Sequence, residues 1–319
     1  MFNTPILFIV FNRLHTTQQV FERIRAVRPK YLYIAADGPR PTHAEDAAKC
    51  TEVREWLLAA IDWEVELHTL FRTENVGCGK GPAGAISWFF EQVEQGIILE
   101  DDCLPSASFF PFCETLLERY ATNSTIHSIA GTNLLPQFSA TDADYFFSYQ
   151  SGIWGWATWR RSWLLYDYYA TAWGDVTVQE KFNNFFTHDR ERQVYVNGVS
   201  KAYHERNVSW WDYQFIFSRI INGSYGIIPQ KNLISNIGFG EEASHTFDTN
   251  SVLGFLPIDT ISFPMVHPKS IEVYQPYDNL YRDQFFAALP DLQSPQMSSS
   301  LITKLVQQIK NKIKRLIKK

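Results

Sequence analysis

Four short segments of the first hundred positions have the hydrophobic patterns of strands, and the segments between them show helical spacing. Residues 5–11, 31–36 and 96–99 are largely apolar, as is typical of buried strands, while residues 64–71 alternate between polar and apolar. The intervening segments predict three helices, which end near residues 27, 60 and 93. Thr16 or Thr17 can cap the first helix, and Thr42 with Glu45 forms a capping-box pattern before the second.

This repetition of strand and helix predicts an α/β fold with a doubly wound, mostly parallel sheet and helices on both faces. In such sheets, ligands bind beyond the carboxyl ends of the strands. Arg13, Asp37 and the run Glu100-Asp101-Asp102 each follow a predicted strand directly. We therefore expect these side chains to converge on one crevice.

The second half of the chain is less regular. We expect helices over residues 109–120, 175–205 and 210–221, and strands near residues 126–130 and 225–228. Residues 235–246 predict a loop rich in glycine and serine, and residues 250–290 predict irregular structure. The chain therefore divides into one domain of residues 1–290, whose halves meet at residue 104, a polar linker over residues 291–300 and a terminal helix over residues 301–319.

The three consecutive acids Glu100, Asp101 and Asp102 follow an Ile-Ile-Leu segment that is apolar on both faces. Three carboxylates at the end of a buried strand repel one another and are costly unless a positive group lies among them. A solvated cluster after an edge strand is the structural alternative, but a strand that is apolar on both faces is typical of a sheet's centre. We therefore favour a Mn²⁺ or Mg²⁺ ion that carries a diphosphate and acts as a Lewis acid.

Asp212 closes the segment Ser209-Trp210-Trp211-Asp212, which precedes a predicted helix. The Ser-x-x-Asp spacing is that of a capping box, and an acid in the first turn also complements the helix dipole. The pattern alone therefore favours a cap. The functional alternative is a general base that accepts a proton from an attacking hydroxyl, with the flanking tryptophans as a dry wall and a stacking face.

Two glycine-containing segments are weaker candidates for phosphate binding. Residues 77–81, Gly-Cys-Gly-Lys-Gly, lack the Gly-x4-Gly-Lys-Ser/Thr spacing of a P-loop, which disfavours a P-loop nucleoside triphosphatase. Ser244 and His245 follow the segment Gly-Phe-Gly at residues 238–240. A lone loop histidine is usually a surface residue, but these glycines also permit a lid that closes on phosphates.

The net charge of −5 is unevenly distributed along the chain. Residues 301–319 contain seven basic residues and no acid, so the remaining 300 residues carry a net charge of −12. An acidic body with a basic tail argues against nucleic acid as a partner. Apolar residues recur on one face of the tail, which predicts a basic amphipathic helix on an anionic membrane surface. A solvated or packed terminal helix is the alternative.

The cysteines and the N-terminal residues indicate a cellular compartment. The four cysteines match no zinc motif and nothing indicates secretion, so we expect reduced thiols. Residues 5–11 are too short to span a bilayer and lack the basic n-region of a signal peptide. Together with the tail, these features predict a cytoplasmic protein that lies peripherally on the inner face of the cell membrane.

The order of these motifs resembles that of nucleotide-sugar glycosyltransferases with the GT-A fold. The shared series is a first strand followed by Arg, a strand ending in Asp-Gly, Glu-Asp-Asp, a Gly-Trp segment, Trp-Asp opening a helix, and Gly-Phe-Gly before Ser-His-Thr-Phe. It covers roughly residues 5–250 and is most like the N-acetylglucosaminyltransferase I family of inverting β-1,2 enzymes and its bacterial relatives. The resemblance implies a Rossmann-like GT-A sheet, in which residues 1–104 bind the nucleotide and residues 105–290 bind sugar and acceptor.

The resemblance also implies roles for the residues at the strand ends. Arg13 and Asp37 would contact the uracil and the phosphates of a UDP-sugar. Asp101 would bind the ribose, and Glu100 would bind the donor sugar. Asp102 would be the only protein ligand of the metal, Mn²⁺ or Mg²⁺.

Further roles fall in the second half of the chain. Trp154 would lie beside the donor sugar, although the family has an aliphatic residue there. Trp211 and Asp212 would flank the sugar, with Asp212 as the base. Ser244 and His245 lie in the loop that would become ordered over the diphosphate.

The predicted function is therefore a metal-dependent inverting glycosyltransferase that moves GlcNAc or a related hexose from a UDP-sugar. The acceptor is expected to be a glycan or a lipid-linked oligosaccharide in bacterial surface-polysaccharide or lipid-linked glycan synthesis. The family's Golgi enzymes carry an N-terminal membrane anchor and stem. We expect this chain to lack them and the basic tail of residues 301–319 to supply the membrane contact instead.

Three alternatives remain open at this point. A sugar-phosphate nucleotidyltransferase shares the sheet, but it should carry a glycine-rich loop after the first strand, and residues 11–15 contain no glycine. A non-catalytic glycan-binding protein of the same fold needs no base at Asp212. A retaining transferase differs from an inverting one in the anomeric configuration of its product.

Overall fold

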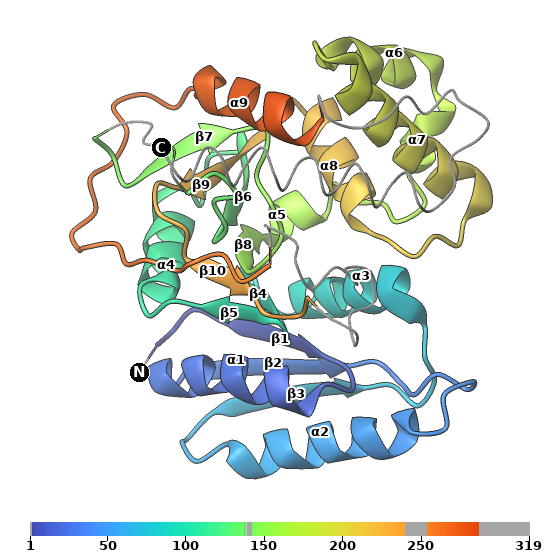
Figure 1. Cartoon of the computed structure of the whole chain (residues 1–319), viewed down its shortest axis with the longest axis vertical. Coiled ribbons are helices and arrows are strands. Elements are labelled where there is room, and N and C mark those ends of the chain that lie inside the picture. Colours follow the sequence, from blue (N-terminus) through green and yellow to red (C-terminus); the bar gives the residue numbers. More distant parts are fainter. Residues whose placement is uncertain (1, 137, 139–141, 240–253, 287–319) are drawn as a thin grey trace.

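An eight-stranded sheet forms the centre of the computed structural model, which describes residues 2–136, 138, 142–239 and 254–286. The strands lie in the order β3-β2-β1-β4-β8-β6-β9-β7 (Figure 1). Their bounds are β1 (Ile6–Val10), β2 (Tyr31–Ala36), β3 (Glu66–Phe71), β4 (Gln95–Glu100), β6 (Ile126–Ala130), β7 (Tyr145–Ser148), β8 (Trp156–Trp159) and β9 (Tyr225–Pro229). A second, two-stranded sheet pairs β5 (Cys103–Pro105) with β10 (Ile234–Asn236) in antiparallel register.

The first four strands of the main sheet, β3-β2-β1-β4, are parallel. Beyond them, β8 runs antiparallel between β4 and β6, while β9 pairs parallel with β6 and antiparallel with β7. Parallel neighbours need crossover connections, which here are α1 (Leu14–Val27), α2 (Asp46–Ala60) and α3 (Gly77–Phe90). The predicted α/β sheet is confirmed, with its parallel strands concentrated in the N-terminal block.

Side chains of β1 alternate between two apolar cores, because successive strand residues point to opposite faces of a sheet. Phe8 packs on one face with residues of α1, α2 and α4 (Phe109–Arg119). Leu7 packs on the other face with residues of α3 and α8 (Asp212–Ile221). Both side chains are fully buried. The sheet is therefore covered on both faces, and its carboxyl edge is where a ligand can enter.

The predicted caps of the first two helices are wrong. The hydroxyls of Thr16 and Thr17 donate to the carbonyl oxygen of Arg13, at 3.3 and 2.7 Å, so neither can cap the backbone amides of α1. Helix α2 begins one residue after Glu45 and has no side-chain cap, and Thr42 contacts the neighbouring histidine ring instead. The start of α2 does not follow the capping-box spacing. An ion pair between Arg40, in the loop before the helix, and Asp46, its first residue, holds this region instead.

The second half contains more elements than its sequence pattern predicts. Strands β5, β7, β8 and β10 were not expected, and a helix, α9 (Gln275–Phe285), occupies part of the segment predicted to be irregular. The helix expected over residues 175–205 is two helices, α6 (Val176–Phe185) and α7 (Asp189–Glu205). Two short elements, α5 (Arg160–Trp163) and the 3₁₀ helix η1 (Thr171–Gly174), precede them.

Helices α6, α7 and α8 form a helical layer beside the second half of the sheet (Figure 1). This layer has an apolar core of its own, in which Trp173, Phe182 and Phe217 pack edge to face with one another. Helix α8 also contributes to the core on the sheet. The layer therefore fixes the position of the first turn of α8, where Asp212 lies.

None of the helices in the described part of the chain is long and apolar enough to cross a bilayer. Residues 291–300, predicted as a linker, and residues 301–319, predicted as an amphipathic helix, lie outside the described residues. The same holds for Ser244 and His245. The membrane contact and the lid therefore stay predictions.

Candidate functional site

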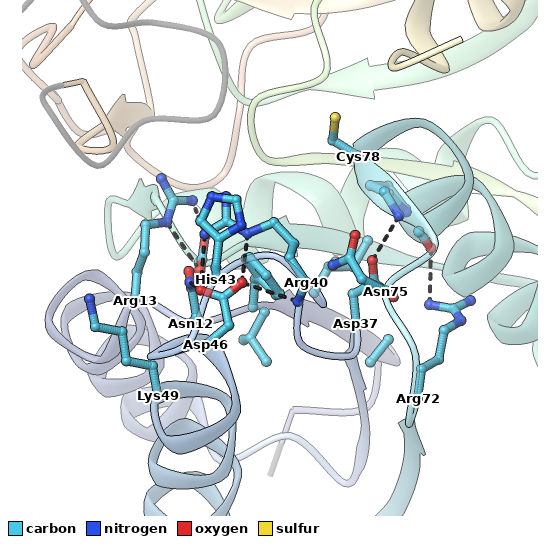
Figure 2. A pocket seen from close by; sticks show the side chains of 18 of the residues that line it. Asn12, Arg13, Asp37, Arg40, His43, Asp46, Lys49, Arg72, Asn75 and Cys78 are labelled. Atoms are coloured by element: carbon cyan, nitrogen blue, oxygen red, sulfur yellow. Dashed lines mark hydrogen bonds and ion pairs between the residues drawn. The ribbon is translucent and has the colours of Figure 1, made fainter. Parts of the chain in front are cut away.

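A pocket of about 770 Å³ opens at the carboxyl ends of β1, β2 and β4 (Figure 2). Four residues singled out in the sequence line it, namely Arg13, Asp37, Glu100 and Asp101. The first turns of α2 and α3 complete its wall. The structure thus brings these four side chains together, as their positions directly after strands lead one to expect.

The positive group among the three acids is Arg13. Its guanidinium forms an ion pair with Asp101 through Nη2, and its Nε lies 3.4 Å from the second oxygen of the same carboxylate. Nη2 also lies 2.9 Å from Oδ2 of Asp102. This corrects the electrostatic argument from the sequence, because an arginine from the end of β1 already compensates part of the charge that we assigned to a metal ion.

One guanidinium does not balance three carboxylates. Glu100 makes no side-chain hydrogen bond or ion pair within the described part of the chain. Burial, together with the nearby charges of Asp102 and Asp101, raises the pKa of Glu100 to about 8. Burial also raises the pKa of Asp101, although Arg13 opposes this shift. With a pKa of about 8, Glu100 is largely protonated at pH 7, and a further cation beside the turn after β4 would favour its ionised form.

Asp37 has a structural role that the sequence did not reveal. Its carboxylate accepts hydrogen bonds from the backbone amides of Val76 and Gly77, at 3.1 Å each, and from Gly38, at 3.0 Å. It therefore caps the N-terminus of α3 from a distance of about forty residues along the chain. Asp37 still lines the pocket, but its oxygens hold the turn that begins α3.

The glycine-rich segment forms the first turn of α3, five residues before the predicted start of that helix. A Cβ atom on Gly79 would lie 2.3 Å from the carbonyl oxygen of Val208. Only glycine therefore permits the segment before α8 to approach α3 this closely. The segment serves helix packing at the edge of the pocket, in agreement with the absence of the P-loop spacing.

A polar cluster at the start of α2 was not expected from the sequence. Asp46 is 3% exposed and accepts hydrogen bonds from Nε of Arg40 at 2.6 Å, from Nη2 of Arg40 at 2.9 Å and from Nδ2 of Asn12 at 2.8 Å. All three side chains line the pocket (Figure 2). Asn12 follows β1 and Arg40 follows β2, and these positions could have indicated that both side chains lie at the pocket. The capping-box pattern instead drew attention to Thr42 and Glu45 as the residues that begin the helix.

We expect Asp46→Asn to lower the free energy of unfolding by about 1–2 kcal/mol at pH 7. The hydrogen bonds from Arg40 are the largest cause that lowers the pKa of Asp46, from 3.8 to about 2. Because the folded-state pKa is depressed, this stabilisation is complete above about pH 4 and is lost as the pH falls toward 2. Urea titrations of the wild type and Asp46→Asn at pH 7, 4 and 3 should therefore show a difference in the free energy of unfolding that becomes smaller at the lowest pH.

The matched control for this prediction is Asp62→Asn, which removes an exposed carboxylate that pairs with Arg25 away from the pocket. Its effect should be smaller than that of Asp46→Asn at pH 7. A stability gap for Asp46→Asn that does not depend on pH would contradict the assignment of the depressed pKa.

Asp212 is the first residue of α8, and Trp211 occupies the N-cap position of this helix. The capping box predicted with Ser209 is wrong, because the helix begins later than expected and has no side-chain cap. Trp211 is 5% exposed and stacks on Trp156 with ring centroids 5.8 Å apart. The carboxylate of Asp212 is close enough to Glu100 to contribute to its raised pKa. Asp212 is therefore a neighbour of the acid cluster, while Trp211 is largely a core residue.

The backbone after β10 covers Asp102. The amide of Ile237 donates to the carbonyl oxygen of Asp102 at 2.8 Å, and a Cβ atom on Gly238 would lie 2.7 Å from the Cβ atom of Asp102. Trp154 lies beside this segment, with its ring 5.8 Å from that of Phe239 in an edge-to-face contact. Asp102 and Trp154 thus share a neighbourhood next to the pocket, although neither belongs to its lining.

The residues present fit a divalent cation only in part. No group of three or more His, Cys, Asp or Glu side chains in the described ranges is arranged to hold a metal ion. The cluster of Glu100, Asp101 and Asp102 nevertheless suits a cation that arrives with a nucleotide diphosphate, because Mg²⁺ and Mn²⁺ commonly bind through one or two carboxylates plus phosphate oxygens. Asp102 is the candidate ligand, and it would have to share its carboxylate with Arg13.

No protein-family model and no curated protein matches the chain. Solved structures do match parts of it. The mannosyltransferase PcManGT from Pyrobaculum calidifontis, in complex with GDP-Man and Mn²⁺, is 13% identical, with a TM-score of 0.34 over 50% of this chain and 46% of that chain. Residues 1–349 of S. aureus TarS are 10% identical, with a TM-score of 0.33 over 49% of this chain and 47% of that chain.

The glycosyltransferase GlyE of Streptococcus pneumoniae TIGR4 is 11% identical, with a TM-score of 0.33 over 71% of this chain and 45% of that chain. This chain therefore spans about half the length of the three structures. Its activity is inferred from the residues of the pocket.

Proposed function

We propose that this chain is a glycosyltransferase that moves a sugar from a nucleotide-sugar to an acceptor hydroxyl. The observation that carries the proposal is the cluster of three acids with one arginine at the end of β4, beside a pocket of about 770 Å³ at the carboxyl edge of a largely parallel sheet. A pocket at this edge suits a nucleotide. Three acids that share one arginine suit a cation-bound diphosphate.

Each acid near the pocket has a separate role in this proposal. Arg13 keeps its ion pair with Asp101 and orients that carboxylate toward the ribose. Asp102, which pairs with Arg13 in the structure, would hold a divalent cation together with the diphosphate. Glu100 contacts the donor sugar. Its carboxyl group lines the pocket and has no hydrogen-bond or ion-pair partner among the described residues, so it is available for this contact.

Asp212 acts as the general base. It accepts the proton of the acceptor hydroxyl while the hydroxyl oxygen forms a bond to the anomeric carbon of the sugar. The bond between that carbon and the phosphate oxygen breaks, and its electrons leave with the nucleoside diphosphate. A Mn²⁺ or Mg²⁺ ion at Asp102, when bound, would stabilise the negative charge on this leaving group as a Lewis acid.

The finer features of the proposal rest on the motif series in the sequence. It supports UDP as the nucleotide, GlcNAc or a related hexose as the sugar, and an inverting displacement like that of the N-acetylglucosaminyltransferase I family. The basic residues of the segment 301–319 support an acceptor at an anionic membrane surface on its cytoplasmic face, such as a lipid-linked oligosaccharide. Ser244 and His245 would contact the diphosphate from the loop that follows β10.

The test is a panel of nucleotide-sugars with Mn²⁺, scored by thermal shift and by slow hydrolysis of the donor. At a ligand concentration of about 100 times Kd, binding stabilises the native state by about 2.7 kcal/mol, which raises Tm by a few degrees. We expect UDP with Mn²⁺ to produce this shift in the wild type and not in Asp102→Ala. Asp62→Ala, which removes an exposed acid paired with Arg25, should behave as the wild type. Equal stabilisation by UDP without metal would contradict the role of Asp102.

A further inference from the structure

Arg54 of α2 ties together the ends of two parallel strands. Its Nη2 atom donates to the carbonyl oxygen of Asp37 at 2.9 Å and to that of Arg72 at 2.8 Å. Asp37 and Arg72 are the first residues after β2 and β3, and both line the pocket, whereas Arg54 does not. The guanidinium carbon lies 5.2 Å from the ring centroid of Phe71, the last residue of β3. One side chain outside the pocket therefore sets the spacing of two residues in its wall.

Asp37 and Arg72 extend this connection to the start of α3. The carboxylate of Asp37 accepts from two backbone amides there, and Nη1 of Arg72 donates to the carbonyl oxygen of Gly81 at 3.3 Å. Nδ2 of Asn75 donates to the carbonyl oxygen of Gly38, in the turn after β2, at 2.8 Å. The guanidinium of Arg54 is thus the link from α2 to a set of hydrogen bonds that shapes this part of the pocket.

The order of the strands assigns these groups to one part of the donor. The sheet runs β3-β2-β1-β4, and neighbouring strands lie about 4.8 Å apart, so the ends of β2 and β3 stand about 10 and 14 Å from the acids at the end of β4. Asp37, Arg72 and Asn75 lie together at one end of the pocket, away from Arg13 (Figure 2). A diphosphate at the acids therefore places the nucleoside at the ends of β2 and β3.

We propose that Arg54 is a positioning residue for the nucleoside of the donor. It acts through the backbone of Asp37 and Arg72, which it holds in the arrangement that their side chains need to enclose the nucleoside. The inference rests on the proposed function, because it takes a nucleoside diphosphate as the ligand. A wall that is already ordered in the free protein binds more tightly, since less conformational freedom is lost on binding.

Arg161 provides a matched control, because it makes the same kind of contacts at the opposite edge of the sheet. Its guanidinium donates to the carbonyl oxygens of Tyr120, Ala121 and Ile126, at 3.1, 3.1 and 2.9 Å, and lies 4.2 Å from the ring centroid of Trp159. These carbonyls come before or at the start of β6, which runs in the same direction as β4. They therefore lie at the amino edge of the sheet, away from the pocket.

The test compares UDP with inorganic pyrophosphate, each titrated with Mn²⁺ by calorimetry into the wild type, Arg54→Met and Arg161→Met. We expect Arg54→Met to raise the Kd of UDP about tenfold and that of pyrophosphate less than about twofold, because the acids at the end of β4 keep their contacts. With the nucleotide-sugar that the wild type hydrolyses fastest, KM should rise about tenfold while kcat stays within about twofold. Arg161→Met should lower Tm and leave both affinities unchanged.

Equal weakening of UDP and pyrophosphate in Arg54→Met, or a lower Tm with unchanged affinity for UDP, would overturn the inference. If Arg54→Met does not fold, Arg54→Lys replaces it. An ammonium lacks the planar fork of the guanidinium, so UDP should bind about threefold more weakly and pyrophosphate as in the wild type. Wild-type affinity for UDP in Arg54→Lys would then overturn the inference.

The same titrations separate this inference from the proposed function. If the wild type binds neither UDP nor another nucleotide with Mn²⁺, the proposed function fails and the inference with it. If the wild type binds UDP and Arg54→Met binds it as tightly, only the inference fails.

Discussion

Replacing Arg13 with methionine should lower the free energy of unfolding by about 3–5 kcal/mol at pH 7, the usual loss when one partner of a buried ion pair is removed. Asp101 is 3% exposed, and its ion pair with Arg13 is the largest attractive contribution that offsets its burial. Methionine has a similar length and leaves the carboxylate unpaired. Urea unfolding of the variant and the wild type measures the difference directly.

The size of this loss should depend on pH in a defined direction. Without Arg13, the pKa of Asp101, which burial already raises, should rise further. The penalty is then largest at neutral pH and shrinks as acid protonates the group in the folded protein. Arg25→Met, which breaks exposed ion pairs with Asp62 and Glu22, provides the control and should cost much less. Equal, small losses in both variants would show that Arg13 does not compensate the acid cluster.

Asp212→Asn should reduce kcat by about 10²–10⁴-fold while the affinity for the nucleotide-sugar stays within about twofold. Asparagine keeps the size and the helix-terminal position of the side chain but cannot accept the proton of the attacking hydroxyl. The donor should still bind, because Asp212 does not line the nucleotide pocket at the ends of β1, β2 and β4. Initial rates and an independent binding titration separate the two quantities.

The competing explanation for Asp212 is a structural acid at a helix N-terminus. Asp175→Asn is the matched control, because Asp175 caps α6 and accepts from the backbone amide of Thr177 at 2.8 Å. It should affect Tm and leave turnover unchanged. Full turnover in Asp212→Asn, with a loss of Tm like that of the control, would favour the non-catalytic interpretation that the capping pattern first suggested.

The N-terminal half of the fold could be predicted from the sequence because its signals are local. Strands β1, β2 and β4 of the parallel block are apolar runs, β3 alternates between polar and apolar residues, and each crossover helix has its own spacing of apolar residues. The predicted strand over residues 31–36 coincides with β2. Helix α3 begins earlier than predicted, because its first turn contains several glycines. Glycine has a low helix propensity, but close packing against the segment before α8 requires it here.

The second half could not be predicted equally well, because its strands are short and depend on distant partners. Strand β5 has three residues and pairs with β10 about 130 positions later. Strand β8 consists of Trp-Ala-Thr-Trp, which lacks the length of a strand signal but is fully enclosed between β4 and β6. Non-local pairing of this kind overrides local propensity.

The candidate site was predictable in position and not in its contacts. Side chains that follow parallel strands meet at one edge of the sheet, which is why Arg13, Asp37 and Glu100 line one pocket. The sequence could not reveal that Arg13 reaches two acids almost ninety residues away, or that Asp37 caps α3. Such contacts depend on the side-chain conformations that the folded backbone permits, and they changed the charge balance on which the metal hypothesis was built.

The most direct measurement is a crystal structure of the protein with UDP and Mn²⁺. It should show the nucleotide in the pocket at the ends of β1, β2 and β4, with the metal held between the diphosphate and Asp102. Arg13 should retain its ion pair with Asp101 and no longer pair with Asp102. A well-ordered crystal in which the pocket is empty and Arg13 still binds both aspartates would contradict the proposal that a cation-bound diphosphate shares the space of these acids.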